Sequence, residues 1–162
     1  MNFFQKIISM FLAFLSMLGL FGKSSKPEIK EGEFDFVLTY EVDGEIKKIE
    51  GTYVCEFERV DYYLDGISRH WNGYIKGHEQ SETYALKTTA EGIIKVNLDI
   101  SPAFFMSDPH YKANENTDDP KPEPYLYIVA AESENEYMGN LYEGDDVKII
   151  SFEYDKPIEN TY

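Results

Sequence analysis

The sequence predicts an all-β domain, a seven- or eight-stranded antiparallel sandwich or partly open barrel, preceded by one N-terminal hydrophobic helix. Two observations predict it. Apolar and polar residues alternate at every second position in several short segments, which is the period of a strand with one buried face. Past residue 22, no segment of ten or more residues has the 3.6-residue period of an amphipathic helix. Layered sheet is therefore the expected architecture.

The clearest alternation covers residues 34–42, where every second side chain is apolar. An Asp-Gly pair follows at 43–44, which is a strong signal for a two-residue hairpin turn. That turn places Phe34 opposite Tyr53, and in this register the apolar faces of both strands coincide. The alternation continues to Cys55, which we expect on the buried face.

The remaining strands are shorter and are separated by turn signals. Turns are expected at residues 64–66 and at 91–92, where Asp-Gly and Glu-Gly pairs occur. Residues 107–124 are polar and rich in proline, which is typical of a long surface loop. Residues 132–146 are acidic and are expected to form a loop with a short helical turn. Strands are expected at 70–76, 84–88, 93–100, 125–130 and 147–154.

Residues 1–22 predict a membrane anchor or signal segment. The run from Ile7 to Gly22 contains no charge. As a helix it would span about 24 Å at ~1.5 Å per residue, short of the roughly 30 Å hydrocarbon core of a bilayer. Adding Phe3 and Phe4, with Lys6 reaching the interface, closes that gap. We therefore expect contact with the membrane through residues 3–22.

A cleavable signal peptide is the alternative, in which case the domain is secreted after cleavage. The nearest cleavage site is Gly22-Lys23-Ser24, and its match to the small-residue pattern is poor, which favours an uncleaved anchor. A buried core helix is disfavoured because the run is apolar on every face. No cysteine lies near Leu18-Gly19, so a lipoprotein is not expected.

The expected location is a single-pass position in the cell membrane with the domain on the extracytoplasmic side. Hydrophobic leaders that begin this close to the N-terminus usually export the domain attached to them. Lys23, Lys26 and Lys30 favour the opposite orientation, because positive charge tends to stay in the cytoplasm. Residues 23–32 have the composition of a polar tether, and residues 33–162 form the β domain.

Charge and cysteine content restrict the function. The chain has 15 Lys and Arg against 30 Asp and Glu, a formal net charge of −15. This charge disfavours nucleic-acid binding, because phosphates would be repelled. It also disfavours a domain that lies flat on anionic lipid. The single cysteine, Cys55, rules out an internal disulfide.

No motif indicates catalysis, and whether the domain is an enzyme stays open. Cys55 and His70 could be drawn as a nucleophile and base, but Cys55 is in phase with buried residues and is expected to be an inert thiol. The three histidines lack zinc-site spacing, and no cofactor is expected. Phosphate-binding and serine-hydrolase motifs are absent from the sequence.

The acidic segment after residue 107 contains weak candidates for calcium ligands. Hard cations take six or more oxygens, and Asp108, Asp118 and Asp119 could supply several. The EF-hand spacing and its central glycine are absent, so a solvated acidic loop is the competing interpretation.

Four aromatic residues are candidates for ligand binding, because aromatic side chains near loops stack on sugar rings or anchor protein contacts. Tyr62 and Tyr63 are adjacent and cannot both point inward from a strand, so at least one is expected to be exposed. For Trp71, a core position is the competing interpretation. The candidates are Tyr62, Tyr63, Trp71 and Tyr111.

Three segments, Thr52–Cys55, His70–Ile75 and Ile149–Ile158, resemble parts of small exported or membrane-anchored proteins of clostridia and related Gram-positive bacteria. The resemblance covers most of the chain after the tether. It implies a bacterial, membrane-associated setting in an uncharacterised family with no assigned function, and it transfers no catalytic residue. The lipobox cysteine that many such proteins carry is missing here.

These patterns favour a membrane-tethered extracytoplasmic β module of unknown function, acting as a non-catalytic binding or interaction domain for an envelope protein or glycan. A small cell-envelope hydrolase with no recognisable motif is the alternative. A structural subunit of an envelope complex is a third hypothesis, and it would show a large exposed apolar patch.

Overall fold

A computed structural model describes residues 26–63, 66–78, 82–108, 121–130 and 140–162, which form eight strands and one short helix. The expected all-β class is confirmed. The predicted N-terminal hydrophobic helix lies outside the described residues, and among these residues no helix is long and apolar enough to cross a bilayer. The elements are β1 (Glu31–Val42), β2 (Glu45–Tyr63), β3 (Gly66–Ile75), β4 (Thr83–Thr88), β5 (Ile93–Asn97), α2 (Pro102–Phe105), β6 (Tyr125–Val129), β7 (Asn140–Leu141) and β8 (Val147–Tyr154).

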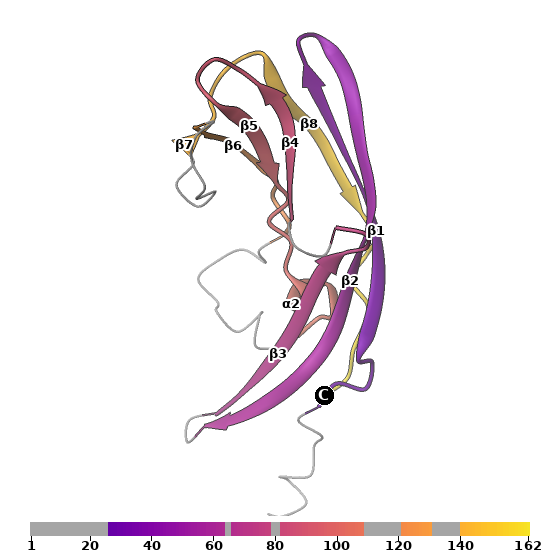
Figure 1. Cartoon of the computed structure of the whole chain (residues 1–162). Coiled ribbons are helices and arrows are strands. Elements are labelled where there is room, and N and C mark those ends of the chain that lie inside the picture. Colours follow the sequence, from indigo (N-terminus) through magenta and orange to yellow (C-terminus); the bar gives the residue numbers. More distant parts are fainter. Residues whose placement is uncertain (1–25, 64–65, 79–81, 109–120, 131–139) are drawn as a thin grey trace, which may run out of the picture.

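The strands form two antiparallel sheets of four strands each, in the orders β3-β2-β1-β8 and β4-β5-β6-β7. The first sheet is strongly curled, like half of a barrel, and the second sheet faces its upper part in Figure 1. The helix α2 lies at the lower part of the first sheet, where it contacts β2 and β3.

The register of the first hairpin is the predicted one. Val42 pairs with Glu45, and Phe34 pairs with Tyr53 across the turn at Asp43 and Gly44. Both turn residues have positive φ, 53° and 81°, as a tight hairpin turn of this type requires. The apolar side chains of β1 and β2 therefore share one face, which is the inner face of the curled sheet.

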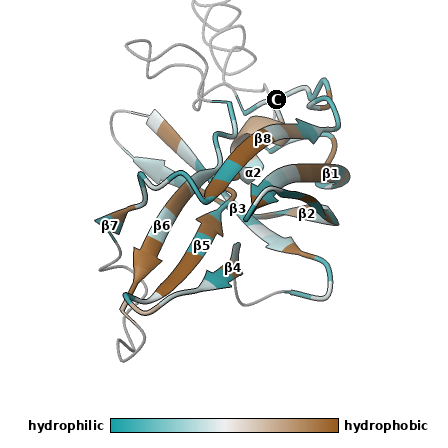
Figure 2. Cartoon of the chain, turned by 90° about the horizontal axis from the view of Figure 1, so that it is seen from above, coloured by the Kyte–Doolittle hydropathy of each residue, from teal (hydrophilic) through white to brown (hydrophobic). Residues whose placement is uncertain are grey.

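The core fills the space between the two sheets and continues onto α2. Phe105 of α2 closes its lower end, with its ring 4.5 Å from Phe34 and 5.9 Å from Tyr53. Seen from above, β5 and β6 are mostly apolar in colour (Figure 2). The buried residues of this cluster are Phe34, Phe36, Leu38, Tyr40, Val42, Tyr53, Cys55, Ile75, Ile94, Val96, Leu98, Ile100, Phe105, Met106 and Val147.

Some boundaries differ from the predicted ones. The strand expected at 93–100 stops at Asn97, because Asp99 adopts a left-handed conformation with φ of 48° that leaves the sheet. The four-residue helix α2 was not predicted, because so short a segment shows no helical period in the sequence. Pro102 fits the first turn of this helix, where no backbone N–H is needed. The expected strand at 70–76 begins earlier, at Gly66.

The two ends of the described chain are bound to each other at the lower end of the domain. The Glu28 amide donates to the Thr161 carbonyl at 3.0 Å, and the Asn160 side chain bonds both the amide and the carbonyl of Ile29, at 3.0 and 2.7 Å. The Phe57 amide donates to the Lys30 carbonyl at 2.7 Å. Residues 28–30, which belong to the segment 23–32 expected to form a tether, are thus hydrogen-bonded to the rest of the domain.

Candidate functional site on the β2–β3 arm

The strand β2 is much longer than its neighbour β1, and this difference creates a projecting arm. The pairing of β1 with β2 begins at Glu31 opposite Glu56. Beyond Glu56, β2 continues for seven residues to Tyr63 and pairs only with β3. We call the two-stranded part formed by residues 57–63 and 66–71 the arm. It extends downward and away from the rest of the sheet in Figure 1.

A bulge at the root of the arm decides which side chains share a face. Phe57 pairs with Trp71, but Arg59 pairs with His70, so Glu58 is an extra residue on β2. Arg59, Asp61 and Tyr63 therefore share the outer face with His70, and Tyr62 shares the inner face with Arg69 and Trp71. The sequence carries a sign of this bulge, because the apolar positions are odd-numbered up to Phe57 and even-numbered at Val60 and Tyr62, with two consecutive charged residues between them.

A buried polar network holds the inner face of the arm at its root. Asp108 is 2 % exposed and lies in the turn after α2. Its Oδ2 accepts a hydrogen bond of 2.8 Å from Trp71 Nε1, and its Oδ1 lies 3.4 Å from Arg69 Nη1. The side chains of Arg69 and Asp108 are both almost fully buried, so this is a desolvated ion pair.

The last residue of the chain completes this network. The Arg69 guanidinium lies 4.4 Å from the centre of the Tyr162 ring, a cation–π distance. The Tyr162 hydroxyl donates to the Met106 carbonyl at 2.6 Å. Burial raises the pKa of Tyr162, and the Asp108 carboxylate adds to the rise. The arm is thereby fixed to the turn after α2 and to residue 162.

The charged groups on the outer face of the arm are paired with each other. Arg59 contacts Glu58 at 2.6 Å and Asp61 at 3.3 Å. His70 Nε2 lies 2.8 Å from Asp61 Oδ2, without hydrogen-bond geometry. These side chains are one third to one half exposed, so each pair adds little to stability. They leave the outer face of the arm close to electrically neutral.

The end of the arm presents two large aromatic side chains to solvent. Tyr62 is 68 % exposed and Tyr63 is 59 % exposed, on opposite faces of the same strand. The sequence predicted that at least one of these two tyrosines is exposed, and in the structure both Tyr62 and Tyr63 are exposed. Trp71, another candidate, is partly buried at the root, where its ring packs edge-on against Phe57 at 5.3 Å. Tyr111 lies outside the described residues.

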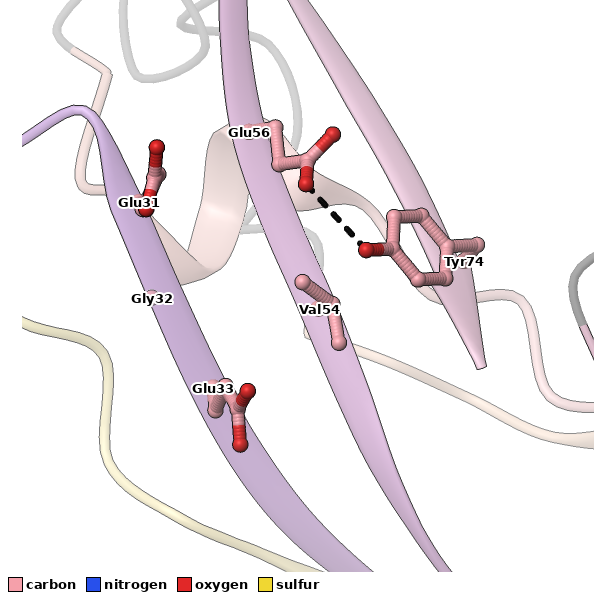
Figure 3. A pocket seen from close by; sticks show the side chains of 6 residues that line it. All are labelled: Glu31, Gly32, Glu33, Val54, Glu56 and Tyr74. Atoms are coloured by element: carbon pink, nitrogen blue, oxygen red, sulfur yellow. Dashed lines mark hydrogen bonds between the residues drawn. The ribbon is translucent and has the colours of Figure 1, made fainter. Parts of the chain in front are cut away.

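A second feature of the same sheet is an acidic hollow of about 300 Å³ on the outer face of β1, β2 and β3 (Figure 3). The Tyr74 hydroxyl donates to Glu56 at 3.1 Å, and Lys76 bonds Glu33 at 3.1 Å. Its carboxylates are thus partly neutralised, and within the described residues no group of three or more His, Cys, Asp or Glu is arranged to hold a metal. The lining residues are Glu31, Gly32, Glu33, Val54, Glu56 and Tyr74.

The calcium candidates are not brought together by any described contact. Asp118 and Asp119 lie outside the described residues. Asp108 is described, but it is buried in the network at the root of the arm, where both of its oxygens face Trp71 and Arg69. The expectation that residues 107–124 lie on the surface is therefore wrong for Asp108.

The candidate nucleophile and base are separated by the sheet. Cys55 is fully buried on the inner face, whereas His70 lies on the outer face of the arm. Burial raises the pKa of the Cys55 thiol to about 12, with the Glu82 carboxylate adding to the rise. A thiol with this pKa is protonated at neutral pH, so the structure does not favour nucleophilic catalysis by Cys55.

One partly buried acid, Glu82, interacts electrostatically with that thiol. Burial raises the pKa of Glu82, and the hydroxyl of Tyr53 donates to its Oε1 at 3.1 Å, which opposes the rise. The same hydroxyl lies 3.5 Å from the Ile100 carbonyl. The acidic hollow is on the opposite face of the sheet. Glu82 therefore has a structural partner and does not line the described hollow.

The sequence missed the residues that hold the arm in place. Arg69 and Trp71 are two positions apart on one strand, which predicts that they share a face. Nothing in the sequence pairs them with Asp108, 37 residues after Trp71, or with Tyr162. Their arrangement depends on the turn after α2, and this four-residue helix is too short to show a helical period in the sequence.

Comparisons with protein-family models, with curated proteins and with solved structures find no match to this chain. The resemblance to exported clostridial proteins therefore stays a prediction.

Proposed function

We propose that this chain is a non-catalytic binding module, tethered to the extracytoplasmic side of a cell membrane by residues 3–22, that contacts a component of the cell envelope through the end of the β2–β3 arm. The observation that carries the proposal is the exposure of Tyr62 and Tyr63 on adjacent positions of a projecting hairpin. Large aromatic side chains supply most of the contact energy at recognition surfaces.

Rigidity at the root supports this role for the arm. A two-stranded ribbon alone is marginally stable in water. Here the network of Asp108, Arg69, Trp71 and Tyr162 fixes the inner face of the ribbon to the body of the domain. A fixed arm loses less conformational entropy when it meets a partner, which favours binding.

The thiol of Cys55 and the partly buried carboxyl of Glu82 give no comparable support to a hydrolase. Cys55 is buried and its pKa is raised to about 12, and Glu82 is bonded to Tyr53 on the inner side of the sheet. Both groups have packing partners that account for them. The binding role is therefore the better supported one.

Photo-crosslinking in cells that produce the chain tests the proposal. A benzoylphenylalanine at position 63 places the crosslinker at the end of the arm. The same residue at position 46 is the control, because Ile46 is 68 % exposed at the other end of β2. We expect crosslinked products from position 63 and none above background from position 46. Equal yields from both positions contradict the proposal.

A further inference from the structure

The end of the arm lies on the same side of the domain as the entry of the chain from its apolar leader. Figure 1 shows the arm, the first described residues and the C-terminus at one end. The β1–β2 pairing places Glu31 opposite Glu56, and Tyr63 lies seven residues further along β2. At about 3.3 Å per residue, the arm extends roughly 23 Å beyond the start of β1.

The connection between the leader and the domain is short. Pro27 is buried and the Glu28 amide is bonded to the Thr161 carbonyl, so the chain is attached to the domain from these residues onward. Four residues lie between Gly22 and Pro27, so five Cα–Cα steps join them. Even fully extended, they reach only about 17 Å. The lower end of the domain must therefore lie within about 17 Å of the end of the apolar run, which is less than the length of the arm.

The chemistry at the end of the arm suits the boundary between lipid and water. Tyrosine has an apolar ring and a polar hydroxyl, and it is enriched at the interfacial level of membranes. Tyr62 and Tyr63 are both more than half exposed. Residues 57–71 carry three acids and two arginines, a formal charge of −1. So small a charge causes little electrostatic repulsion from a bilayer surface.

We infer that the arm contacts the interfacial zone of the bilayer in which the same chain is anchored, with Tyr62 and Tyr63 at the level of the lipid headgroups. This inference rests on the proposed tether, and it names the envelope component that the arm contacts. A second attachment point restricts the rotation of the domain about its short connection. The end of the domain opposite the arm then faces away from the membrane surface.

The experiment uses the full chain reconstituted in phosphatidylcholine vesicles and labelled with the fluorophore NBD on a cysteine at position 66. Gly66→Cys is suited to this, because a Cβ at Gly66 meets nothing within 4 Å and both tyrosines are retained. The native Cys55 is fully buried and does not compete for the label. Ile46→Cys supplies the control position. Doxyl groups placed high on the lipid chains quench NBD that lies at the interface.

We expect at least twofold stronger quenching at position 66 than at position 46, and loss of that difference in Tyr62→Ser,Tyr63→Ser. Vesicle flotation separates the two proposals. A chain that does not float with the vesicles contradicts the tether, and with it this inference. A chain that floats but shows equal quenching at both positions overturns the bilayer contact alone. Crosslinks from position 63 to a protein then identify a protein partner instead.

Discussion

The indole Nε1 of Trp71 donates a 2.8 Å hydrogen bond to Oδ2 of Asp108, which links β3 to the turn after α2. The same carboxylate faces the buried guanidinium of Arg69. From the sequence alone, Trp71 is a candidate for ligand binding and Asp108 is a candidate calcium ligand. In the structure, these two residues and Arg69 together hold the arm in place.

Removing one member of the buried ion pair is expected to destabilise the domain. Asp108→Asn leaves the Arg69 charge buried without its partner, which costs about 3–5 kcal/mol in comparable pairs. Urea unfolding of the detergent-solubilised chain, followed by far-ultraviolet circular dichroism, measures the change. Trp71→Phe is the matched comparison, because it removes one hydrogen bond and is expected to cost about 1 kcal/mol.

A double variant tests whether the charge is the cause. Arg69→Met,Asp108→Leu replaces both charged groups by apolar ones, and it is expected to be more stable than Asp108→Asn alone. If the double variant is the less stable of the two, then packing and not the unpaired charge explains the loss.

We expect that Gly73 cannot be replaced by a residue with a side chain, whereas Gly66 on the same strand can. A Cβ at Gly73 would lie 2.0 Å from the Tyr53 hydroxyl oxygen, and a Cβ at Gly66 meets nothing within 4 Å. Gly73→Ala forces the buried Tyr53 ring to move, at a cost of about 1–3 kcal/mol. Gly66→Ala should change the unfolding midpoint little. Equal effects of the two substitutions would argue against this packing.

Ionisation of Glu82 is expected to reduce the stability of the folded domain as the pH rises. Burial raises its pKa above the usual 4.5, so the protonated form is favoured in the folded state. The contribution of this group is therefore complete below pH 4.5 and declines as the pH rises through the folded pKa. Glu82→Gln keeps a group that can bond Tyr53 and removes the charge, so it should raise the thermal midpoint at pH 7 and leave it nearly unchanged at pH 4. If the thermal midpoint of Glu82→Gln at pH 7 is lower than that of the unchanged chain, then the charge of Glu82 does not destabilise the folded state.

Lys87 is expected to have the opposite pH dependence. It bonds Asp43 at 2.6 Å and also bonds Asp146, and so it joins β4 to two turns of the first sheet. The bond with Lys87 lowers the pKa of Asp146 below 3.8, so this stabilisation is present above that pH and is lost as the pH falls through the folded pKa. The thermal midpoint of Lys87→Met should be lower than that of the unchanged chain at pH 7, and the two should converge as the pH falls below 3.8. A constant difference at all pH values would exclude this pair as the cause.

Cys55 is expected to resist thiol reagents in the folded chain. With a pKa of about 12, its thiolate fraction at pH 8 is about 10³-fold lower than that of an ordinary cysteine. Reaction with a disulfide reagent should be slower by at least that factor in buffer and should reach the normal rate in urea. Rapid labelling of the folded chain would show that the thiol is accessible.

The sequence predicted what depends on local period and turn chemistry. The β1–β2 register followed from the Asp-Gly turn and from the alternation that runs through Cys55 and Phe57, and both agree with the structure. The hairpin about Gly92 followed in the same way. These features involve neighbouring segments, in which pairing is fixed by counting residues from the turn.

Features that depend on distant contacts could not be predicted. The burial of Asp108 depends on Arg69 and Trp71, which lie more than 35 residues earlier. A charged residue in a polar segment is normally solvated, so the sequence favoured a surface position for it.

Protease accessibility on intact cells tests the central claim, which is that the domain is held outside the membrane by residues 3–22. The chain carries an epitope tag joined to Tyr162 by a flexible linker. We expect the tag to sediment with membranes and to be digested by external protease before lysis. A matched variant that lacks residues 1–22 should leave the membrane fraction. A tag that survives external protease and is digested only after lysis places the domain in the cytoplasm and contradicts the account.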